Sequence, residues 1–520
     1  MSYRIGIDVG GTNTDAVILD EALVVVASVK SPTTTDTSVG VIAAVDAVLE
    51  ASGVDPAAIS HAMLGTTHCT NAIVERRRLG RVGVLRLGAP ATTAVPPLEG
   101  WPDDLRQAIA AQVYVIDGGF EVDGRVLSPV DEDAVREACH RMRGEVDAVA
   151  VVGVFSPINE SQEERVAAIV NDELGVPVSR SARVGSLGLL ERENATVLNA
   201  ALMETLRDMA QGFVDALRDR GITAEPYFGQ NDGTLMRREY ALEFPVFTIG
   251  CGPTNSIRGA AHLSGMTDAL VVDIGGTTTD IGALVDGFPR QSAQAVEIGG
   301  IRTNFRMPDV LSIGLGGGTI VRSSETAAGK PSAAGMSVGP DSVGYRLRRE
   351  ALAFGGSTLT ATDVALAVGN AGIPGVSAPA VNESVLNSAW PAIREMLEDS
   401  VDRMKPNATP VPVILVGGGS IIAPQELAGV SQLIRPNHFG AANAVGAALG
   451  EIAGQVEKIY GTGGDRRDAR ADAAREASDR ARLAGADPAT IEVVSVEELP
   501  IAYMDGQAVL IRARAVGRLL

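Results

Sequence analysis

One eight-residue pattern occurs twice in the 520-residue chain, about half a chain apart, and it constrains the fold more than any other feature. The copies are Asp8-Val-Gly-Gly-Thr-Asn-Thr-Asp15 and Asp273-Ile-Gly-Gly-Thr-Thr-Thr-Asp280. Each copy stands between two short apolar runs, which predicts a β-hairpin with the glycines at its tip. The repeat therefore predicts two related domains that face each other. The flanking runs are Tyr3–Ile7, Ala16–Leu19, Ala269–Val272 and Ile281–Val285.

The residue types in both loops suit a phosphate group. Paired glycines let the backbone approach closely and point N–H groups inward, and threonine hydroxyls add donors. Asp8 and Asp273, which open the loops, are suited to Mg²⁺, since this ion binds oxygen ligands and keeps much of its water. Hairpin geometry alone gives no reason to repeat the carboxylates and both threonines. The residues assigned to phosphate binding are Gly10, Gly11, Thr12, Asn13, Thr14, Gly275, Gly276, Thr277, Thr278 and Thr279.

Two further glycine turns follow predicted strands. Gly417-Gly-Gly-Ser420 comes after the Val-rich run Val411–Val416 and precedes a segment compatible with a helix. It is a candidate for placing a helix N-terminus near a nucleotide, so Gly417, Gly418, Gly419 and Ser420 join the predicted site. Gly316-Gly-Gly-Thr319 is either a similar element or a simple tight turn.

Charge and cysteine content exclude several classes of function. The formal net charge is −20, and a chain this acidic does not attract nucleic-acid phosphates. Three scattered cysteines, Cys69, Cys139 and Cys251, form no metal or disulfide pattern, so we expect a reducing cytoplasm. No run of 18 apolar residues is present, so no membrane association is expected.

Hydrophobic periodicity and turn residues predict most of the remaining elements. Val113–Ile116 and Gly124–Leu127 are expected to form a hairpin arm, and Pro391 to break or kink its helix. The charged stretch Arg466–Arg482 is expected to be a solvated helix. Strands are expected at Val82–Leu87, Val149–Phe155, Pro245–Ile249 and around Asp505-Gly506 near the C-terminus. Helices are expected at Ser38–Ala51, Gln162–Leu174, Leu187–Arg220, Ala361–Val368, Val381–Arg403 and Asn443–Ile452.

Two hairpin phosphate loops and a late glycine turn resemble the superfamily of actin, sugar kinases and heat-shock-chaperone ATPases. Within it, the chain resembles the hydantoinase A/oxoprolinase family, in its short form. The segments that carry the resemblance are Ile5–Asp15, Gly65–Arg76, Glu191–Ala200, Gly229–Gly233, Ser337–Ser342 and Thr360–Asp363. One departure is Gly250-Cys-Gly-Pro-Thr-Asn255, where the family has an S-G-P-A turn.

The resemblance implies an α/β fold with two facing actin-like (ribonuclease-H-like) ATPase domains and a nucleotide cleft between them. It implies ATP and Mg²⁺ as cofactors, and phosphorylation of an amide or enol oxygen. Asp8 and Asp273 would hold Mg²⁺, while Asp15 or Asp280 would orient it or polarise the attacking group. The expected boundaries are 1–183 for the first domain, 184–460 for the second, and 461–520 for an appended helix and strands.

The leading hypothesis is an ATP-dependent amidohydrolase acting on a cyclic amide or carbonyl compound, or the ATPase subunit of such an enzyme. A second hydantoinase-type subunit and a homo-oligomer are the expected partners. A sugar or small-molecule kinase, a carboxylase subunit and a non-enzymatic ATP-driven activator remain alternatives.

Several other residues have both a functional and a structural interpretation. Cys251 is either a nucleophile or a small buried thiol. His68 either faces the cleft or is an ordinary loop residue. Glu191, Arg192 and Glu193 either approach the substrate or form a solvated or inter-domain charge cluster.

Overall fold

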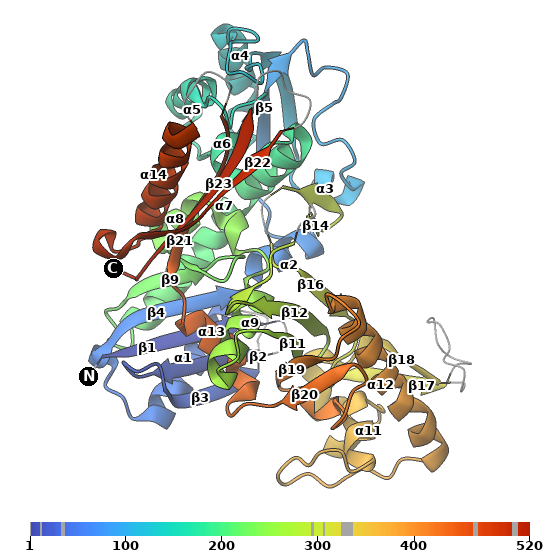
Figure 1. The fold of residues 1–520 in the computed structure, drawn as a ribbon. Helices are drawn as coiled ribbons and strands as arrows, with labels where there is room; N and C mark the ends of the chain where they lie inside the picture. The colour runs from blue at the N-terminus through green and yellow to red at the C-terminus, as the bar shows by residue number, and fades with distance from the viewer. Residues whose placement is uncertain are drawn as a thin grey trace.

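The computed structural model describes residues 2–10, 13–32, 37–292, 296–304, 307–323, 336–460, 466–501 and 508–520. Its strands form three main sheets, of nine, six and four strands (Figure 1). Two small hairpins, β14–β15 (Val296–Ile298, Ile301–Thr303) and β17–β18 (Thr319–Ser323, Met336–Ser342), complete the β structure of the described residues.

The nine-stranded sheet contains the first phosphate loop. Its strand order is β22-β23-β21-β10-β9-β4-β1-β2-β3, so the chain's first and last strands share one sheet. The hairpin β1–β2 is antiparallel, and β4 continues the sheet parallel to β1. The strands are β1 (Tyr3–Val9), β2 (Asn13–Leu19), β3 (Val25–Pro32), β4 (Ile59–Thr66), β9 (Glu225–Gly229), β10 (Leu235–Arg237), β21 (Ile452–Tyr460), β22 (Glu492–Pro500) and β23 (Val509–Gly517).

The six-stranded sheet contains the second phosphate loop and repeats this arrangement. The hairpin β11–β12 is antiparallel, and β19 lies parallel to β11 on its other side, as β4 does for β1. The order is β13-β12-β11-β19-β20, with β16 also paired to β12. The strands are β11 (Ala269–Ile274), β12 (Thr279–Val285), β13 (Phe288–Pro289), β16 (Val310–Ile313), β19 (Val411–Val416) and β20 (Val430–Ile434).

The four-stranded sheet is parallel and has the order β6-β5-β7-β8. The predicted hairpin arm at its edge is wrong. Val113–Ile116 belongs to β6, which runs parallel to β5, while Val126 makes only an isolated bridge to Phe120. The chain passes through the helix α3 (Asp103–Ala108) between β5 and β6. Such a crossover connection brings β6 back parallel to β5. The strands are β5 (Val82–Ala89), β6 (Gln112–Asp117), β7 (Ala148–Gly153) and β8 (Val178–Arg180).

Helices α9 (Cys251–Ser264) and α13 (Ala442–Ala448) pack together between the two hairpin-bearing sheets (Figure 1). Ile257 and Ala260 of α9 pack against strands of the six-stranded sheet. Ala444 and Val445 of α13 pack against β2 of the nine-stranded sheet. The helix pair therefore joins the cores of both halves. The other helices are α1 (Thr37–Ser52), α2 (His68–Glu75), α4 (Glu132–Met142), α5 (Ser161–Leu174), α6 (Ser181–Val184), α7 (Leu189–Arg218), α8 (Arg238–Glu243), α10 (Leu347–Glu350), α11 (Ala361–Ala367), α12 (Glu383–Met404) and α14 (Arg466–Ala484).

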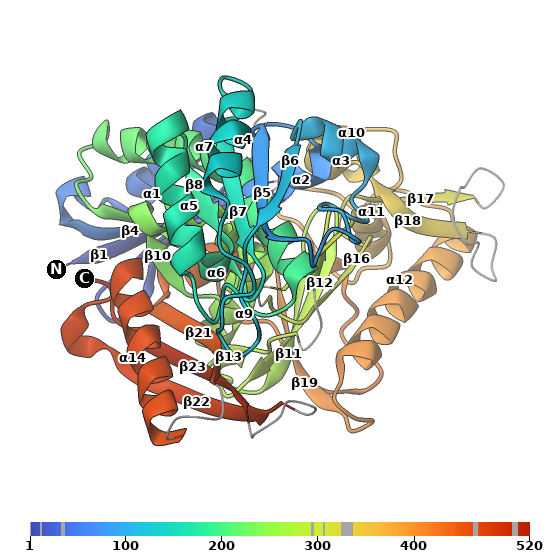
Figure 2. The same cartoon turned by 90° about the horizontal axis from the view of Figure 1, so that it is seen from above.

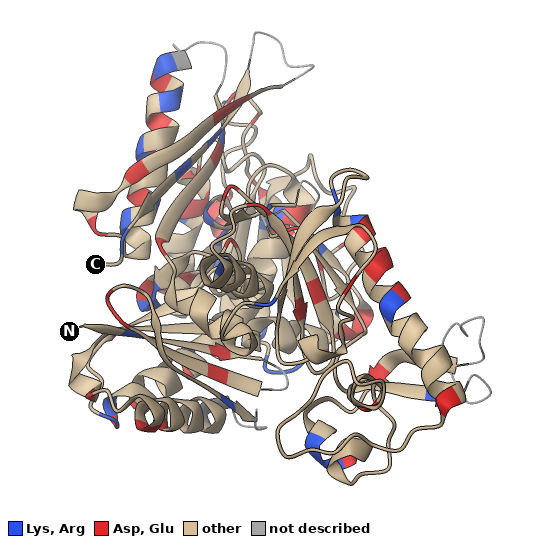
Figure 3. Ribbon diagram, turned by 60° about the horizontal axis from the view of Figure 1, so that its bottom comes forward, with Lys and Arg blue, Asp and Glu red and all other residues tan. Residues whose placement is uncertain are grey.

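Residues after 460 extend the nine-stranded sheet, and α14 covers that extension (Figure 2). Figure 3 shows charged residues of both signs along α14. The prediction of a solvated helix holds for one face only, because Ala473, Ala477, Ala481 and Ala484 are buried in the main core. Their spacing places them on one side of the helix, and short side chains let α14 approach the strands closely. The predicted turn at Asp505-Gly506 lies outside the described residues.

Two predicted elements have a different form in the structure. Pro245–Ile249 is not a strand: residues Pro245–Thr248 form a 3₁₀ turn, in which Pro245 has no N–H that a strand ladder requires. The helix expected at Asn443–Ile452 ends at Ala448, because Ile452 begins β21 and pairs with Leu235 of β10. Pro391 does lie inside α12, as expected, but the helix continues through it.

Candidate functional site

The two phosphate-loop hairpins have the same turn. The Gly10 N–H donates to the Asn13 carbonyl at 3.0 Å, and the equivalent Gly275 N–H donates to the Thr278 carbonyl at 2.9 Å. In each hairpin the two aspartates are cross-strand partners, Asp8 with Asp15 and Asp273 with Asp280. Cross-strand partners lie on the same face of a sheet, so each hairpin presents a carboxylate pair. Gly11 and Thr12 lie outside the described residues.

These two pairs come together although they belong to different sheets. Burial is the larger cause, and the negative charge of Asp15 the second, that raises the pKa of Asp8 to about 7. Burial also raises the pKa of Asp280 to about 6 and that of Asp273 above its usual value. The charge of Asp273 contributes to the raised pKa of each of the other three. One electrostatic cluster therefore contains carboxylates from both loops.

Side chains from α9 and α13 link the two loops. The Asn255 amide donates to Asp8 Oδ1 at 3.4 Å, and the Asn443 amide donates to Asp8 Oδ2 at 3.5 Å. The Ser256 hydroxyl hydrogen-bonds to both Asp273 and Asn443. Sequence reasoning missed Ser256 and Asn443 as site residues, since polar residues in two small-residue helices carry no motif of their own. Their position between the carboxylates gives them a role in fixing the loop-to-loop geometry.

Lys30 on β3 is a second residue that sequence reasoning missed. Its ammonium group lies 2.6 Å from the Asp15 carboxylate, which is its cross-strand neighbour. A Cβ atom placed on Gly418 would lie 3.7 Å from Lys30 Cε, so the side chain also reaches the third glycine turn. The pairing of β2 with β3 aligns Lys30 with Asp15, and no motif in the sequence indicates that register. Lys30 thus brings a positive charge to the acidic cluster and lies beside a glycine turn from the other half of the molecule.

The two additional glycine turns support the second loop. The N–H groups of Gly317 and Gly318 donate to the Gly275 and Gly276 carbonyls at 3.0 and 2.7 Å. The Gly419 N–H donates to the Ile274 carbonyl at 2.7 Å. Gly417 has φ +84°, and a Cβ there would collide with the Asp273 carboxylate, so only glycine fits. These turns therefore hold the shape of the loop around Asp273.

The threonines of the second loop differ in accessibility, and the third glycine turn differs from its predicted form. Thr277 and Thr278 are exposed at the loop tip, whereas Thr279 is fully buried and donates its hydroxyl to the Leu315 carbonyl at 2.6 Å. The sequence predicted a helix after Gly417–Gly419, and this prediction is wrong. The chain makes only a 3₁₀ turn there, at Ser420–Ile422. Ala423 precedes a proline and is extended, which prevents a longer helix.

The carboxylate cluster supplies part of the ligand set that a bound metal ion needs. Within the described ranges, no three His, Cys, Asp or Glu side chains are arranged to hold a metal by themselves. Mg²⁺ commonly uses one or two carboxylates, with water and substrate phosphates completing its shell. Asp8 and Asp273 fit that pattern. A divalent cation would offset the cost of burying their negative charges, which raises the pKa of both carboxylates.

Buried contacts account for three of the remaining candidates, Cys251, Arg192 and Glu193. Cys251 is buried, and burial raises the pKa of its thiol to about 12, so it is protonated at neutral pH. His68 begins α2 beside Arg78, at 3.3 Å. Glu193 is fully buried and forms an ion pair with Arg86 at 2.7 Å, while Arg192 donates to the Gly153 carbonyl at 2.6 Å. These buried contacts exclude the solvated interpretation of Arg192 and Glu193, and they tie α7 to the four-stranded sheet.

The predicted fold class, an α/β fold with two facing domains of the kind found in ATP-dependent caprolactamase and acetone carboxylase, is confirmed. The crystal structure of the ATP-dependent caprolactamase from Pseudomonas jessenii superimposes with a TM-score of 0.77 at 20% identity, covering 99% of this chain and 88% of that one. None of the described helices is long and apolar enough to cross a membrane.

The chain belongs to the hydantoinase/oxoprolinase family. The hydantoinase/oxoprolinase N-terminal region matches residues 4–174, and the hydantoinase/oxoprolinase domain matches residues 192–372. The caprolactamase subunit alpha of Pseudomonas jessenii is 26% identical over 88% of this chain and 67% of its own length. The acetophenone carboxylase gamma subunit of Aromatoleum aromaticum is 28% identical over 70% of this chain and 53% of its own length. Across its curated relatives, the matched region spans 53 to 67% of the relative's length.

Proposed function

We propose that this protein binds and hydrolyses Mg²⁺·ATP between its two phosphate loops, as the ATP-using subunit of a hydantoinase-type enzyme. The observation that carries the proposal is the convergence of Asp8, Asp15, Asp273 and Asp280, from two hairpins with the same turn, into one cluster. Two loops with glycine N–H groups would hold the phosphates, and Asp8 and Asp273 would hold Mg²⁺.

In this proposal, the protein contributes positioning and charge neutralisation. Lys30 and the backbone N–H groups would stabilise the charge that develops on the transferred phosphoryl group. Asp15 or Asp280 would orient the metal or polarise the acceptor. The phosphoryl group would go to the oxygen of a cyclic amide, which makes the carbonyl carbon a better electrophile for hydrolysis, and a second subunit would complete that step.

A carboxylase subunit is the second candidate, because two of the relatives are subunits of acetophenone and acetone carboxylases. There the phosphoryl acceptor would be the oxygen of an enol rather than that of an amide. Both candidates use the same nucleotide site and differ in the acceptor.

The test measures ATP hydrolysis by the purified chain with hydantoin, oxoproline and a lactam, with ketones plus bicarbonate, and with sugars. Each series is repeated with a candidate partner subunit. Stimulation by a cyclic amide, with the ring-opened acid as product, supports the amidohydrolase. Stimulation that requires a ketone and bicarbonate supports the carboxylase. Stimulation by sugars alone, with a phosphosugar formed, contradicts both.

A further inference from the structure

Strand β22 ends the nine-stranded sheet. Among the described residues it pairs with β23 on one side and with no strand on the other. Figure 2 shows it at the margin of the molecule. An edge strand presents a row of backbone N–H and C=O groups with which a further strand can pair. Proteins use such edges to bind an extended segment of another polypeptide.

The side chains of β22 are unusually apolar for a strand at an edge. Val493, Val494 and Leu499 are 43%, 52% and 38% exposed. A long edge strand with exposed apolar side chains is a surface that favours association with another chain. A bulge between Val493 and Ser495 interrupts the first part of the strand. The regular part, which we call the docking edge, is residues 495–500.

One face of the docking edge is already covered by α14. Glu498 forms an ion pair with Arg470 of that helix at 2.9 Å, and Val496 packs against the main core. Side chains alternate between the two faces of a strand. The residues left on the open face are Ser495, Glu497 and Leu499.

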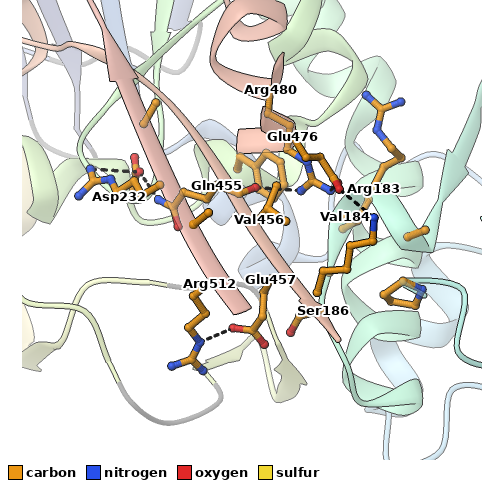
Figure 4. A pocket seen from close by; sticks show the side chains of 18 of the residues that line it. Arg183, Val184, Ser186, Asp232, Gln455, Val456, Glu457, Glu476, Arg480 and Arg512 are labelled. Atoms are coloured by element: carbon orange, nitrogen blue, oxygen red, sulfur yellow. Dashed lines mark hydrogen bonds and ion pairs between the residues drawn. The ribbon is translucent and has the colours of Figure 1, made fainter. Parts of the chain in front are cut away.

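A row of charged side chains crosses the open face and ends at Glu497. Glu457, Arg512 and Glu497 are cross-strand neighbours on β21, β23 and β22. Arg512 is paired with Glu457 at 2.7 Å, on the wall of the pocket that Figure 4 shows. Glu497 is exposed, and no described cation forms an ion pair with it. The row therefore ends in an unpaired carboxylate, beside which an added strand would place its own side chain.

An apolar row lies next to the charged row. Ile459, Leu510 and Leu499 are cross-strand neighbours, and Leu499 is the exposed member at the edge. Opposite charges and apolar pairs directly across a strand pair are both stabilising. The segment that complements this edge therefore has a lysine or arginine and an apolar residue two positions apart.

A second copy of β22 does not meet this requirement. The strand contains Glu492, Glu497 and Glu498 and no lysine or arginine. Pairing it with itself would bring three carboxylates from each copy to one seam without a cation in either strand, and like charges across a strand pair are destabilising. The net charge of −20 adds to this repulsion. The charge pattern thus favours a different, basic polypeptide.

We propose that residues 495–500 are the docking edge for an extended basic segment of a partner polypeptide, which adds a strand to the nine-stranded sheet. A lysine or arginine of the segment pairs with Glu497, and an apolar residue covers Leu499. Five strands separate β22 from β1, so the edge lies roughly 29 Å from β1 at about 4.8 Å per strand. Binding here needs no nucleotide, so the proposal stands or falls independently of the proposed function.

Fluorescence anisotropy of a labelled peptide, titrated with the full chain without nucleotide, tests the docking edge. The probe Thr-Val-Thr-Lys-Val-Thr has the pattern of an antiparallel partner of residues 495–500. We expect saturable binding, which becomes at least about tenfold weaker when glutamate replaces the lysine. Methylation of the peptide's backbone nitrogens should weaken it equally, because they can no longer donate hydrogen bonds. No saturable binding of the lysine peptide, or equal binding of either control peptide, overturns the proposal.

A charge reversal locates the bound peptide. Glu497→Lys should bind the glutamate peptide at least about tenfold better than the lysine peptide, and Glu497→Gln should bind both alike. Glu426→Lys, at an exposed position between β19 and β20, is the matched control and should keep the wild-type preference. Circular dichroism confirms the fold of each variant. A wild-type preference in Glu497→Lys overturns the proposal.

Hydrogen exchange measured by mass spectrometry shows which backbone groups the peptide covers. The lysine peptide should slow exchange in residues 492–500 and leave α12 unchanged. Protection confined to other segments overturns the proposal. Protection of residues 492–500 that grows with protein concentration in the absence of peptide identifies a second copy as the occupant, and it overturns the proposal as well.

Discussion

At the residue scale, the four aspartates of the phosphate loops all have raised pKa values, with burial as the first cause. They are enclosed by both halves of the molecule and repel one another, which is unfavourable unless a cation or a proton is present. Proteins retain such clusters where charge is needed for function. Each carboxylate can therefore be tested by a substitution that removes its charge and keeps its shape.

Asp273→Asn should abolish ATP turnover, with a loss of at least about 100-fold, because the metal and phosphate lose a charged partner. The fold should survive, since the amide removes a buried charge and keeps the hydrogen bond with Ser256. Initial rates of phosphate release give the activity, and urea unfolding gives the stability. Asp268→Asn, at an exposed position just before β11, is the control. Undiminished turnover in Asp273→Asn would refute the assignment of this loop.

Asp8 should make stability depend on pH in the absence of metal. Burial raises its pKa from 3.8 to about 7, so the native state binds the proton more tightly than the unfolded state. Its stabilising contribution is therefore complete below pH 4 and is lost as the pH rises to 7. Urea midpoints measured between pH 5 and 8 in EDTA should fall more steeply for the wild type than for Asp8→Asn. Equal slopes would show that Asp8 does not titrate in this range.

At the element scale, the crossing of α9 and α13 sets the geometry of the carboxylate cluster. A Cβ atom on Gly446 would collide with the backbone carbonyl of Asn255, and one on Gly259 would collide with that of Ala442. Glycine at these positions lets the helices approach closely enough for Asn255 and Asn443 to reach Asp8. The position of the site thus depends on residues without any functional group.

Gly446→Ala should separate the two helices, because the obstructing atoms are backbone and cannot rotate away. We expect a loss of about 1–3 kcal/mol in the free energy of unfolding, the usual cost of overpacking, together with weaker Mg²⁺·ATP binding. Chemical denaturation and nucleotide titration measure the two effects. Gly440→Ala, where an added Cβ meets no atom within 4 Å, is the matched control. If both variants behave alike, the close crossing does not determine the site.

At the scale of the whole molecule, the proposed nucleotide site is built from two sheets whose phosphate loops are 265 residues apart in the chain, from Asp8 to Asp273. A ligand that contacts both loops stabilises the native arrangement of the halves and adds about 2.7 kcal/mol at a concentration 100 times its Kd. Such a ligand acts as a connection between the domains.

Mg²⁺·ATP should therefore raise the melting temperature of the wild type, and Asp8→Asn or Asp273→Asn alone should each remove most of the increase. The reason is that both loops belong to one site, so losing either half weakens the whole. Differential scanning fluorimetry with Mg²⁺·ATP, and with ATP in EDTA, makes the measurement. A full increase in either single variant would indicate that each loop binds ligands separately.

The sequence by itself determined the hairpins and the family, because these depend on local turn residues and on motifs that are continuous in the chain. It predicted most helices and strands for the same reason, whereas phosphate binding by the two loops stays a prediction from their residue types. It missed Lys30, Ser256 and Asn443, and it placed a strand at Pro245–Ile249 and a hairpin arm at Gly124–Leu127. Those features depend on which distant segments pair or pack together, and only the tertiary structure decides that.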